Sequence, residues 1–185
     1  MVASMRTAIL CACSVVLSLS AGCGDDETGS PEPKPEPEVA AFQRDAEPAG
    51  PRLWLDGTRG DDGRLRIELR GAELGEVLGW AAHVRHDADA FAIEAGAITE
   101  ALGSTVEAAQ LVSVGAGDTA LGEARRGVAL GPVTIDEPAV LAVLDIGEPQ
   151  ATSPIGLERV VVRRADGSWV DVATAGGVLT EGGAP

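Results

Sequence analysis

The folded part of the chain is marked by apolar residues that alternate with polar ones. The clearest case is residues 64–70, where Leu65, Ile67 and Leu69 share one face and charged residues occupy the other. Side chains on one face of a strand recur every two residues, so this segment predicts a half-buried β-strand. Similar patterns, or short apolar runs, predict further strands at 77–86, 139–146, 157–164, 169–173 and 176–180.

The turns between these segments indicate an all-β fold. Asp166-Gly167 suits a tight turn with positive φ, so the strands on its two sides predict a β-hairpin. Short strands with frequent turns and no helical crossovers are typical of a β-sandwich. Glu94–Gln110 stays open between strand and short helix, because Ile98, Leu102 and Val106 recur at a spacing of four.

The N-terminus carries a hydrophobic signal of a different kind. Arg6 precedes an apolar run from Ala8 to Leu19, and acidic residues follow from Asp25. The run is shorter than the roughly 20 residues that a membrane-spanning helix needs. Residues 1–22 are therefore predicted to be an export signal peptide.

The end of this signal resembles the lipobox of bacterial lipoproteins, in which small residues precede a cysteine. Here the residues are Leu19-Ser20-Ala21-Gly22, followed by Cys23. The resemblance implies cleavage before Cys23 and an acyl lipid on its thiol, which would anchor the protein in the bacterial cell envelope. Because Gly24 rather than an aspartate follows, we expect the outer membrane. Cys11 and Cys13 lie in the removed segment, so no disulfide is predicted.

Residues 23–50 are predicted to form a linker. They are rich in acids and proline, with alternating proline from Pro31 to Pro37. Proline fixes φ and lacks an N–H, so the segment favours an extended spacer. The predicted order is a signal peptide at 1–22, a lipidated linker at 23–50, a β-sandwich at 51–182 and a tail at 183–185.

Charge and composition exclude several classes of function. The 185 residues include 29 acidic and 14 basic ones, which gives a net charge of −15 and disfavours a nucleic-acid partner. The paired acids fall in predicted turns rather than in a cleft, and no Gly-x-Ser-x-Gly motif occurs. Their oxygens are of the kind that binds Ca²⁺, but no spaced calcium loop supports such a site. We predict neither an enzyme nor a metal or other cofactor.

Two short motifs are better explained by the fold than by a ligand. His83 and His86 are three residues apart on a predicted strand, which places them on opposite faces and disfavours a shared metal. Gly115-Ala116-Gly117 follows a strand-like segment, but later glycines interrupt the chain where a dinucleotide site needs a helix. A turn between two strands is predicted there.

The sandwich region resembles cohesin domains. The resemblance begins in Gly79–Asp87, where an alternating strand leads into an Asp-containing turn, and continues with Phe91 and Ile93. The segments that match the end of the family pattern are 140–146, 157–162, Asp166-Gly167, 170–172 and 177–179. The resemblance spans most of residues 52–180 and implies a jelly-roll β-sandwich of about nine strands, shared with some cellulose-binding modules. His86 departs from the usual aromatic residue, and no dockerin-like repeat occurs in this chain.

This resemblance implies a non-catalytic binding or scaffolding module. Its extracytoplasmic ligand would be a dockerin-like protein or a polysaccharide; a structural envelope lipoprotein without such a ligand is the alternative. Trp54 and Trp169 are the candidate contact residues, because each points away from neighbouring Leu or Val residues expected in the core. Exposed indoles stack on sugars and anchor protein interfaces. Alternatively, Trp54 packs at the domain edge under the linker.

Overall fold

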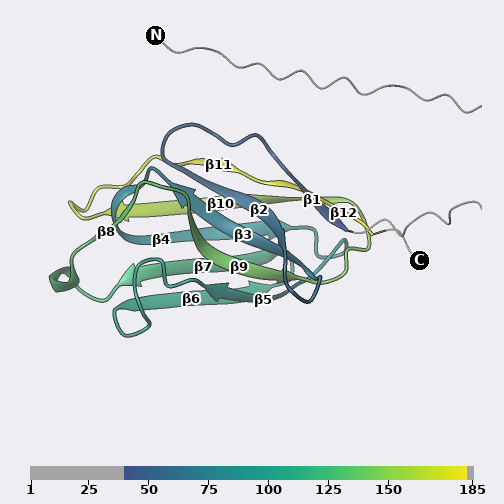
Figure 1. Cartoon of the computed structure of the whole chain (residues 1–185), viewed down its shortest axis with the longest axis horizontal. Coiled ribbons are helices and arrows are strands. Elements are labelled where there is room, and N and C mark those ends of the chain that lie inside the picture. Colours follow the sequence, from purple (N-terminus) through teal and green to yellow (C-terminus); the bar gives the residue numbers. More distant parts are fainter. Residues whose placement is uncertain (1–39, 183–185) are drawn as a thin grey trace, which may run out of the picture. The chain divides into compact units, whose positions relative to one another are not determined.

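Two sheets pack face to face over residues 40–182, the part of the chain that the computed structural model describes (Figure 1). The strands are β1 (Ala41–Arg44), β2 (Arg52–Arg59), β3 (Leu65–Ala72), β4 (Gly75–His86), β5 (Ile93–Ile98), β6 (Ala108–Gly115), β7 (Asp118–Arg125), β8 (Val133–Ile135), β9 (Ala139–Ile146), β10 (Ser153–Arg164), β11 (Ala173–Ala175) and β12 (Gly177–Thr180). One 3₁₀ turn, η1, covers Val128–Leu130. The larger sheet has the order β1-β12-β10-β4-β7-β6, with β8 paired to β4, and the smaller sheet has the order β11-β2-β3-β9-β5.

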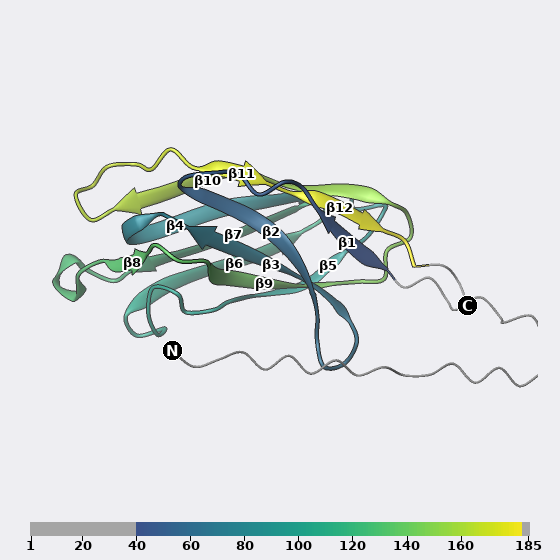
Figure 2. The same cartoon turned by 45° about the horizontal axis from the view of Figure 1, so that its top comes forward.

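The predicted alternation builds the core between the sheets. Leu65, Ile67 and Leu69 of β3 are buried, and so are Trp80 and Val84 of β4. Burying one such side chain stabilises a fold by about 1.5–3 kcal/mol. Every strand pairing described here lies within the compact unit Glu36–Pro185, so this unit contains its own sheets and core (Figure 2).

The all-β sandwich is confirmed, and residues 40–182 form more strands than the nine that the resemblance implies. Four of these strands, β1, β8, β11 and β12, have only three or four residues each. The open segment Glu94–Gln110 contains no helix: β5 ends at Ile98, turns follow, and β6 begins at Ala108. Leu102 is fully buried but Val106 is 83 % exposed, so the spacing of four does not form one buried face.

The sandwich begins earlier than residue 51, because β1 lies inside the predicted linker. It pairs antiparallel with β12, and Phe42 packs against the core. Gly57 and Gly177 make room for this ring, since a Cβ at either position would collide with it. A four-residue strand in a polar context gives too short a pattern to be recognised. The remaining linker, the signal peptide, Cys23 and residues 183–185 lie outside the described residues.

The predicted hairpin after β10 is present but shorter than predicted. Gly167 has a φ of 83°, and the Arg164 N–H donates to the Ser168 carbonyl at 2.9 Å. A bridge joins Arg163 and Trp169, and the Val170 N–H donates to the Val162 carbonyl at 2.9 Å, before the chain crosses to the other sheet, where β11 pairs parallel with β2. The predicted strand 169–173 is therefore only partly formed. Val170 and Val172 pack against the core as the chain crosses to the other sheet.

No helix in residues 40–182 is long and apolar enough to cross a membrane.

Candidate functional site

The outer face of the larger sheet carries a groove with a floor of small side chains. Strands β4 and β7 turn most of their large residues toward the core, so their alternate residues face outward, and β6 continues this face at the edge of the sheet. The floor residues are Gly79, Ala81, Ala109, Gly122 and Ala124. Leu111 of β6, Val161 of β10 and Trp169 also line the groove, which encloses about 360 Å³.

Strand register places the small residues side by side. Ala81 of β4 is opposite Gly122 of β7, and Ala124 of β7 is opposite Ala109 of β6. A Cβ at position 122 would lie 3.0 Å from the Trp80 carbonyl oxygen, tighter than ordinary contact. The side chains of the floor therefore project little above the sheet, and a bound molecule can approach the backbone.

Trp169 is the large exposed aromatic of this groove. Its side chain is 65 % exposed, and the bridge to Arg163 places it beside the edge of β10. The Arg163 guanidinium carbon lies 5.9 Å from the centre of the indole, within the range of a cation–π interaction. The turn before it is stabilised because the Ser168 N–H donates to Asp166 Oδ1 at 2.8 Å, and hydrogen bonding from Ser168 lowers the pKa of Asp166. The indole is thus presented by an ordered turn.

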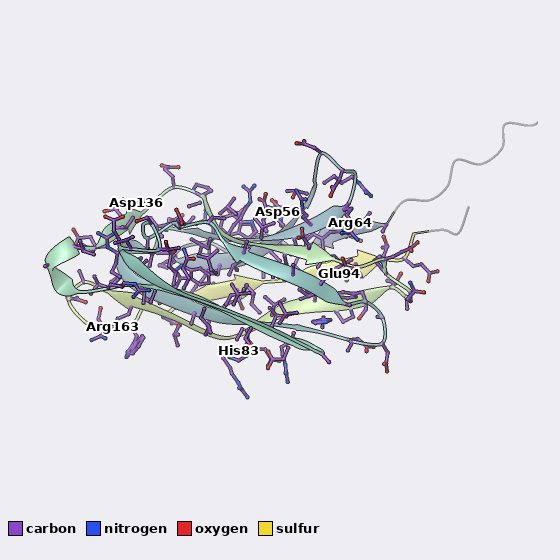
Figure 3. The ribbon with its side chains drawn as sticks, turned by 90° about the horizontal axis from the view of Figure 1, so that it is seen from below. Asp56, Arg64, His83, Glu94, Asp136 and Arg163 are labelled. Carbon is purple, nitrogen blue, oxygen red and sulfur yellow. The ribbon has the colours of Figure 1, made fainter. Side chains whose placement is uncertain are left out.

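A cluster of charged residues continues the same face along β4. Asp118 Oδ1 lies 2.9 Å from His83 Nδ1, and its Oδ2 lies 3.1 Å from Arg85 Nη1. Arg85 also pairs with Glu158 of β10 at 3.3 Å. The hydrogen bond with His83 lowers the pKa of Asp118. Figure 3 shows His83 and Arg163 on the same side of the sandwich, away from Asp56 and Asp136.

A buried carboxyl group lies beneath the groove. Glu123 is only 2 % exposed and sits opposite Trp80 in the strand register. Its Oε2 accepts the Leu102 N–H at 3.0 Å, whereas Oε1 and Trp80 Nε1 have no hydrogen-bond partner among the described residues. Burial raises the pKa of Glu123. On strand β7, Gly122 and Ala124 face outward into the groove, whereas the Glu123 side chain between them faces the core.

The two predicted contact residues are not brought together. Trp54 is 2 % exposed and packs with Ala72 and Ala175 on the smaller sheet. The predicted alternation along β2 is confirmed, because Leu53 and Leu55 belong to the main core while Trp54 belongs to a separate cluster on the opposite face. The face that carries Trp54 is also covered by other residues, so Trp54 is not an exposed contact residue.

The Arg52 side chain explains part of this cover. Its guanidinium carbon lies 5.5 Å from the centre of the Trp54 ring, and Glu47 and Glu73 bind the same guanidinium. Glu47 comes from the predicted linker, as the alternative interpretation of Trp54 supposed. Trp169, in contrast, is exposed as predicted.

The small-residue floor was missed at the sequence level. Its signal is the outward positions of β4 and β7, where Gly79, Ala81, Gly122 and Ala124 replace the polar residues usual on a solvent-facing strand. The turn predicted at Gly117 is present between β6 and β7.

The histidines lie on opposite faces, as expected for a strand. His83 belongs to the charged cluster, whereas His86 stacks on Phe91 with ring centres 4.9 Å apart. Burial lowers the pKa of His86. Over residues 40–182, no three His, Cys, Asp or Glu side chains are grouped so that they could hold a metal ion.

No protein-family model matches the sequence, and no curated protein matches it. Solved structures do match the strand arrangement. The CaDoc0917–CaCohA2 complex, whose CaCohA2 comes from Clostridium acetobutylicum, matches with a TM-score of 0.57 and 16 % identity, over 69 % of this chain and 96 % of that one. The fold is cohesin-like.

Two further structures support this cohesin-like fold. The sixth cohesin of scaffoldin B from Acetivibrio cellulolyticus, in complex with a Cel5 dockerin, has a TM-score of 0.54 and 13 % identity, over 70 % of this chain and 97 % of that one. A non-cellulosomal cohesin from the archaeon Archaeoglobus fulgidus has a TM-score of 0.53 and 13 % identity, over 70 % and 89 %. At these identities the likeness concerns the fold.

Proposed function

We propose that this chain is a non-catalytic protein-binding module that an acyl lipid on Cys23 holds at the outer membrane of a bacterium. The observation that carries the binding role is the groove on the outer face of the larger sheet. Its floor is apolar, and Leu111, Val161 and Trp169 are exposed along it. Contiguous apolar surface of this kind marks interaction sites on soluble domains.

The chemistry of the groove favours a protein partner. The small floor residues allow close approach of a partner's backbone, and Trp169 supplies an aromatic anchor of the type that dominates interface energetics. The adjoining residues His83, Asp118 and Arg85 offer both signs of charge at one end. An apolar centre beside a polar rim is the usual anatomy of a protein interface.

A dockerin-like module is the partner class that we propose. The CaDoc0917–CaCohA2 and scaffoldin B structures are complexes, and the latter contains a dockerin. The ionisable groups of the face support binding over catalysis, because Arg85 links Asp118 and Glu158 in a static ion-pair network. A polysaccharide is the second candidate, favoured by the exposed indole of Trp169.

Binding of residues 36–185 to a panel of purified dockerin modules, measured by biolayer interferometry beside a glycan array, tests the proposal. Leu111→Ala should weaken binding by about tenfold, the size of an interface anchor. Leu130→Ala is the matched control: Leu130 is 43 % exposed against 54 % for Leu111, but it lies outside the groove. Equal affinities for the two variants would contradict the assignment of the groove. Glycan binding without dockerin binding would favour the polysaccharide.

A further inference from the structure

Strand β6 forms an unusually open edge of the larger sheet. Its eight residues, AAQLVSVG, contain no charge and no proline, and it pairs with β7 without a register shift. The other terminal strands of the two sheets within residues 40–182 are protected: β1 and β11 have four and three residues, and β5 carries Glu94 and a register shift. Proteins usually shorten, charge or distort such edges, because an open edge is a template for another strand.

The backbone hydrogen bonds identify which groups point away from β7. The Glu107 carbonyl accepts the Arg126 N–H at 2.7 Å, so alternate residues from Glu107 onward bond toward β7. The intervening Ala108 is satisfied locally, because its N–H donates to the Ser104 carbonyl and its own carbonyl accepts from Arg126 Nε. The residues that direct both N–H and C=O groups to the open edge are Gln110, Val112 and Val114.

Exposed apolar side chains gather at the same edge. Of the seven large apolar residues most exposed in the described part of the chain, four lie on β6 or in the turn before it. These four are Val106, Leu111, Val112 and Val114. Unpaired backbone groups and exposed apolar side chains therefore coincide on one strand, although Val112 also packs against Gly96 of β5. Pairing with another strand would satisfy the backbone groups and cover more of this apolar surface.

We propose that β6 pairs antiparallel with β6 of a second copy of this chain. In the register that places Val112 on the two-fold axis, Gln110 lies opposite Val114 of the second copy, and all three open residues of each strand find partners. Moving the register by two residues toward Ala108 would place Val114 opposite a residue whose backbone is already bonded. The open groups of β6 are thus self-complementary.

The absence of charge on β6 is compatible with a second copy as the partner. The strand carries no ionisable residue, so pairing two copies brings no charged side chains into the centre of the seam, although the net charge of each chain is −15. The two ends of the strand each carry both signs: Glu107 lies beside Arg126 at one end, and Asp118 is paired with His83 and Arg85 at the other. The second copy is therefore identified by the self-complementary register of the open backbone groups.

The two-fold axis of such a pair is perpendicular to the sheet, so both outer faces stay on the same side. The two grooves would then open in one direction on a continuous sheet. A partner with two binding modules could engage both, which raises its apparent affinity through effective concentration. The seam itself does not depend on the proposed function of the groove.

Analytical ultracentrifugation of residues 36–185 over a concentration series tests the seam. The unmodified chain should reach twice the mass of one copy. Val112→Pro removes an edge N–H without touching the bonds to β7, and Val114→Lys adds a charge; each should halve that mass. Val161→Lys is the matched control, since Val161 is 44 % exposed against 41 % for Val114 and lies on β10. It should keep the dimer while weakening dockerin capture by the groove.

Amide hydrogen exchange gives a readout at the level of single residues. The N–H groups of Gln110, Val112 and Val114 should be protected at high concentration and exchange faster on dilution. Circular dichroism of Val112→Pro and Val114→Lys checks that the sandwich still folds. A chain that stays monomeric throughout the series, or a dimer that persists in a folded Val114→Lys, overturns the seam. Loss of dockerin capture alone would instead count against the groove.

Discussion

Glu123 is the charged member of the three buried polar residues in the described chain, the others being Thr119 and Ser153. One oxygen accepts the Leu102 N–H, and this bond ties the turn before β6 to strand β7. Arg125 strengthens the same connection, because its Nη1 donates to the Leu102 carbonyl and its Nη2 to the Leu130 carbonyl. Glu123 and Arg125 are two residues apart and lie on the same face of β7, where they bind the N–H and the carbonyl of Leu102.

Glu123→Gln should stabilise the protein at alkaline pH. Burial raises the pKa of Glu123 in the folded chain above its value in the unfolded chain. At a pH between these two values, the carboxyl group is mostly protonated in the folded chain and mostly ionised in the unfolded chain. The contribution of Glu123 to the free energy of unfolding therefore falls as pH rises through this window. A glutamine keeps an acceptor for Leu102 without a charge. We expect a gain of about 1–2 kcal/mol at pH 8 and a smaller one at pH 5.

Urea denaturation of the two proteins at both pH values measures this difference. Gln43→Ala serves as a control, because Gln43 is exposed on β1 and cannot ionise. Because the lowered pKa of His86 changes stability in the opposite direction, the informative quantity is the difference between the two proteins. A gain from Glu123→Gln that is the same at pH 5 and pH 8 would contradict the assignment of the buried charge.

The three indoles should respond differently to a quencher in solution. Trp54 and Trp80 are 2 % and 3 % exposed, whereas Trp169 is 65 % exposed. Acrylamide should therefore quench one red-shifted component and leave two protected ones. Trp169→Phe should remove the quenchable component with little change in the free energy of unfolding, within about 0.5 kcal/mol. Strong protection of all three indoles would exclude Trp169 from the groove surface.

At the scale of strands, a strand could be predicted from the sequence when it was long and buried on one face. The predicted segment 139–146 coincides with β9, and 77–86 covers most of β4, because both strands carry long apolar runs or alternation. The short strands β1 and β11 were not predicted, because their three or four residues contain no apolar run; β12 is equally short, but Val178 and Leu179 mark it within the predicted strand 176–180. Their positions are set by tertiary contacts, such as Phe42 against Gly57.

The site could be predicted only in part for a related reason. Trp169 stands out in the sequence as a large residue in an outward position, and it is exposed. Trp54 has the same local pattern but is buried by residues that the local pattern does not reveal. Strand β11 is far along the chain, and Glu47, which binds Arg52 over the indole, precedes the predicted domain. The groove floor consists of small residues, whose significance appears only when neighbouring strands bring them together.

Strand β1 makes a specific prediction about where the domain begins. Phe42→Ala should lower the free energy of unfolding by about 2–3 kcal/mol, because it removes an aromatic ring that packs against the core and leaves a gap between two glycines. Gln43→Ala is the matched control, since it leaves the strand pairing and changes an exposed side chain. Thermal denaturation of residues 36–185 measures both. Equal melting temperatures for the two variants would place β1 outside the cooperative unit.

At the scale of the whole molecule, charge and apolar surface are separated. The chain carries 29 acidic residues against 14 basic ones, yet the floor of the groove and the whole of β6 carry none. Net negative charge keeps such a protein soluble and repels anionic surfaces. The uncharged areas are therefore the places where contact with another protein costs the least electrostatic work.

In the proposed function the acidic chain is held at a membrane by an acyl lipid on Cys23, and this part of the proposal has its own test. Expressed in a Gram-negative host, the full chain should partition into the detergent-rich phase of a Triton X-114 extraction, because an acyl chain gains about 0.8 kcal/mol per buried CH₂. Cys23→Ala should move it to the aqueous phase. Cys11→Ala and Cys13→Ala are matched controls within the predicted signal peptide, and both should behave like the natural chain. A natural chain already found in the aqueous phase would exclude the anchor and leave the sandwich as a free module.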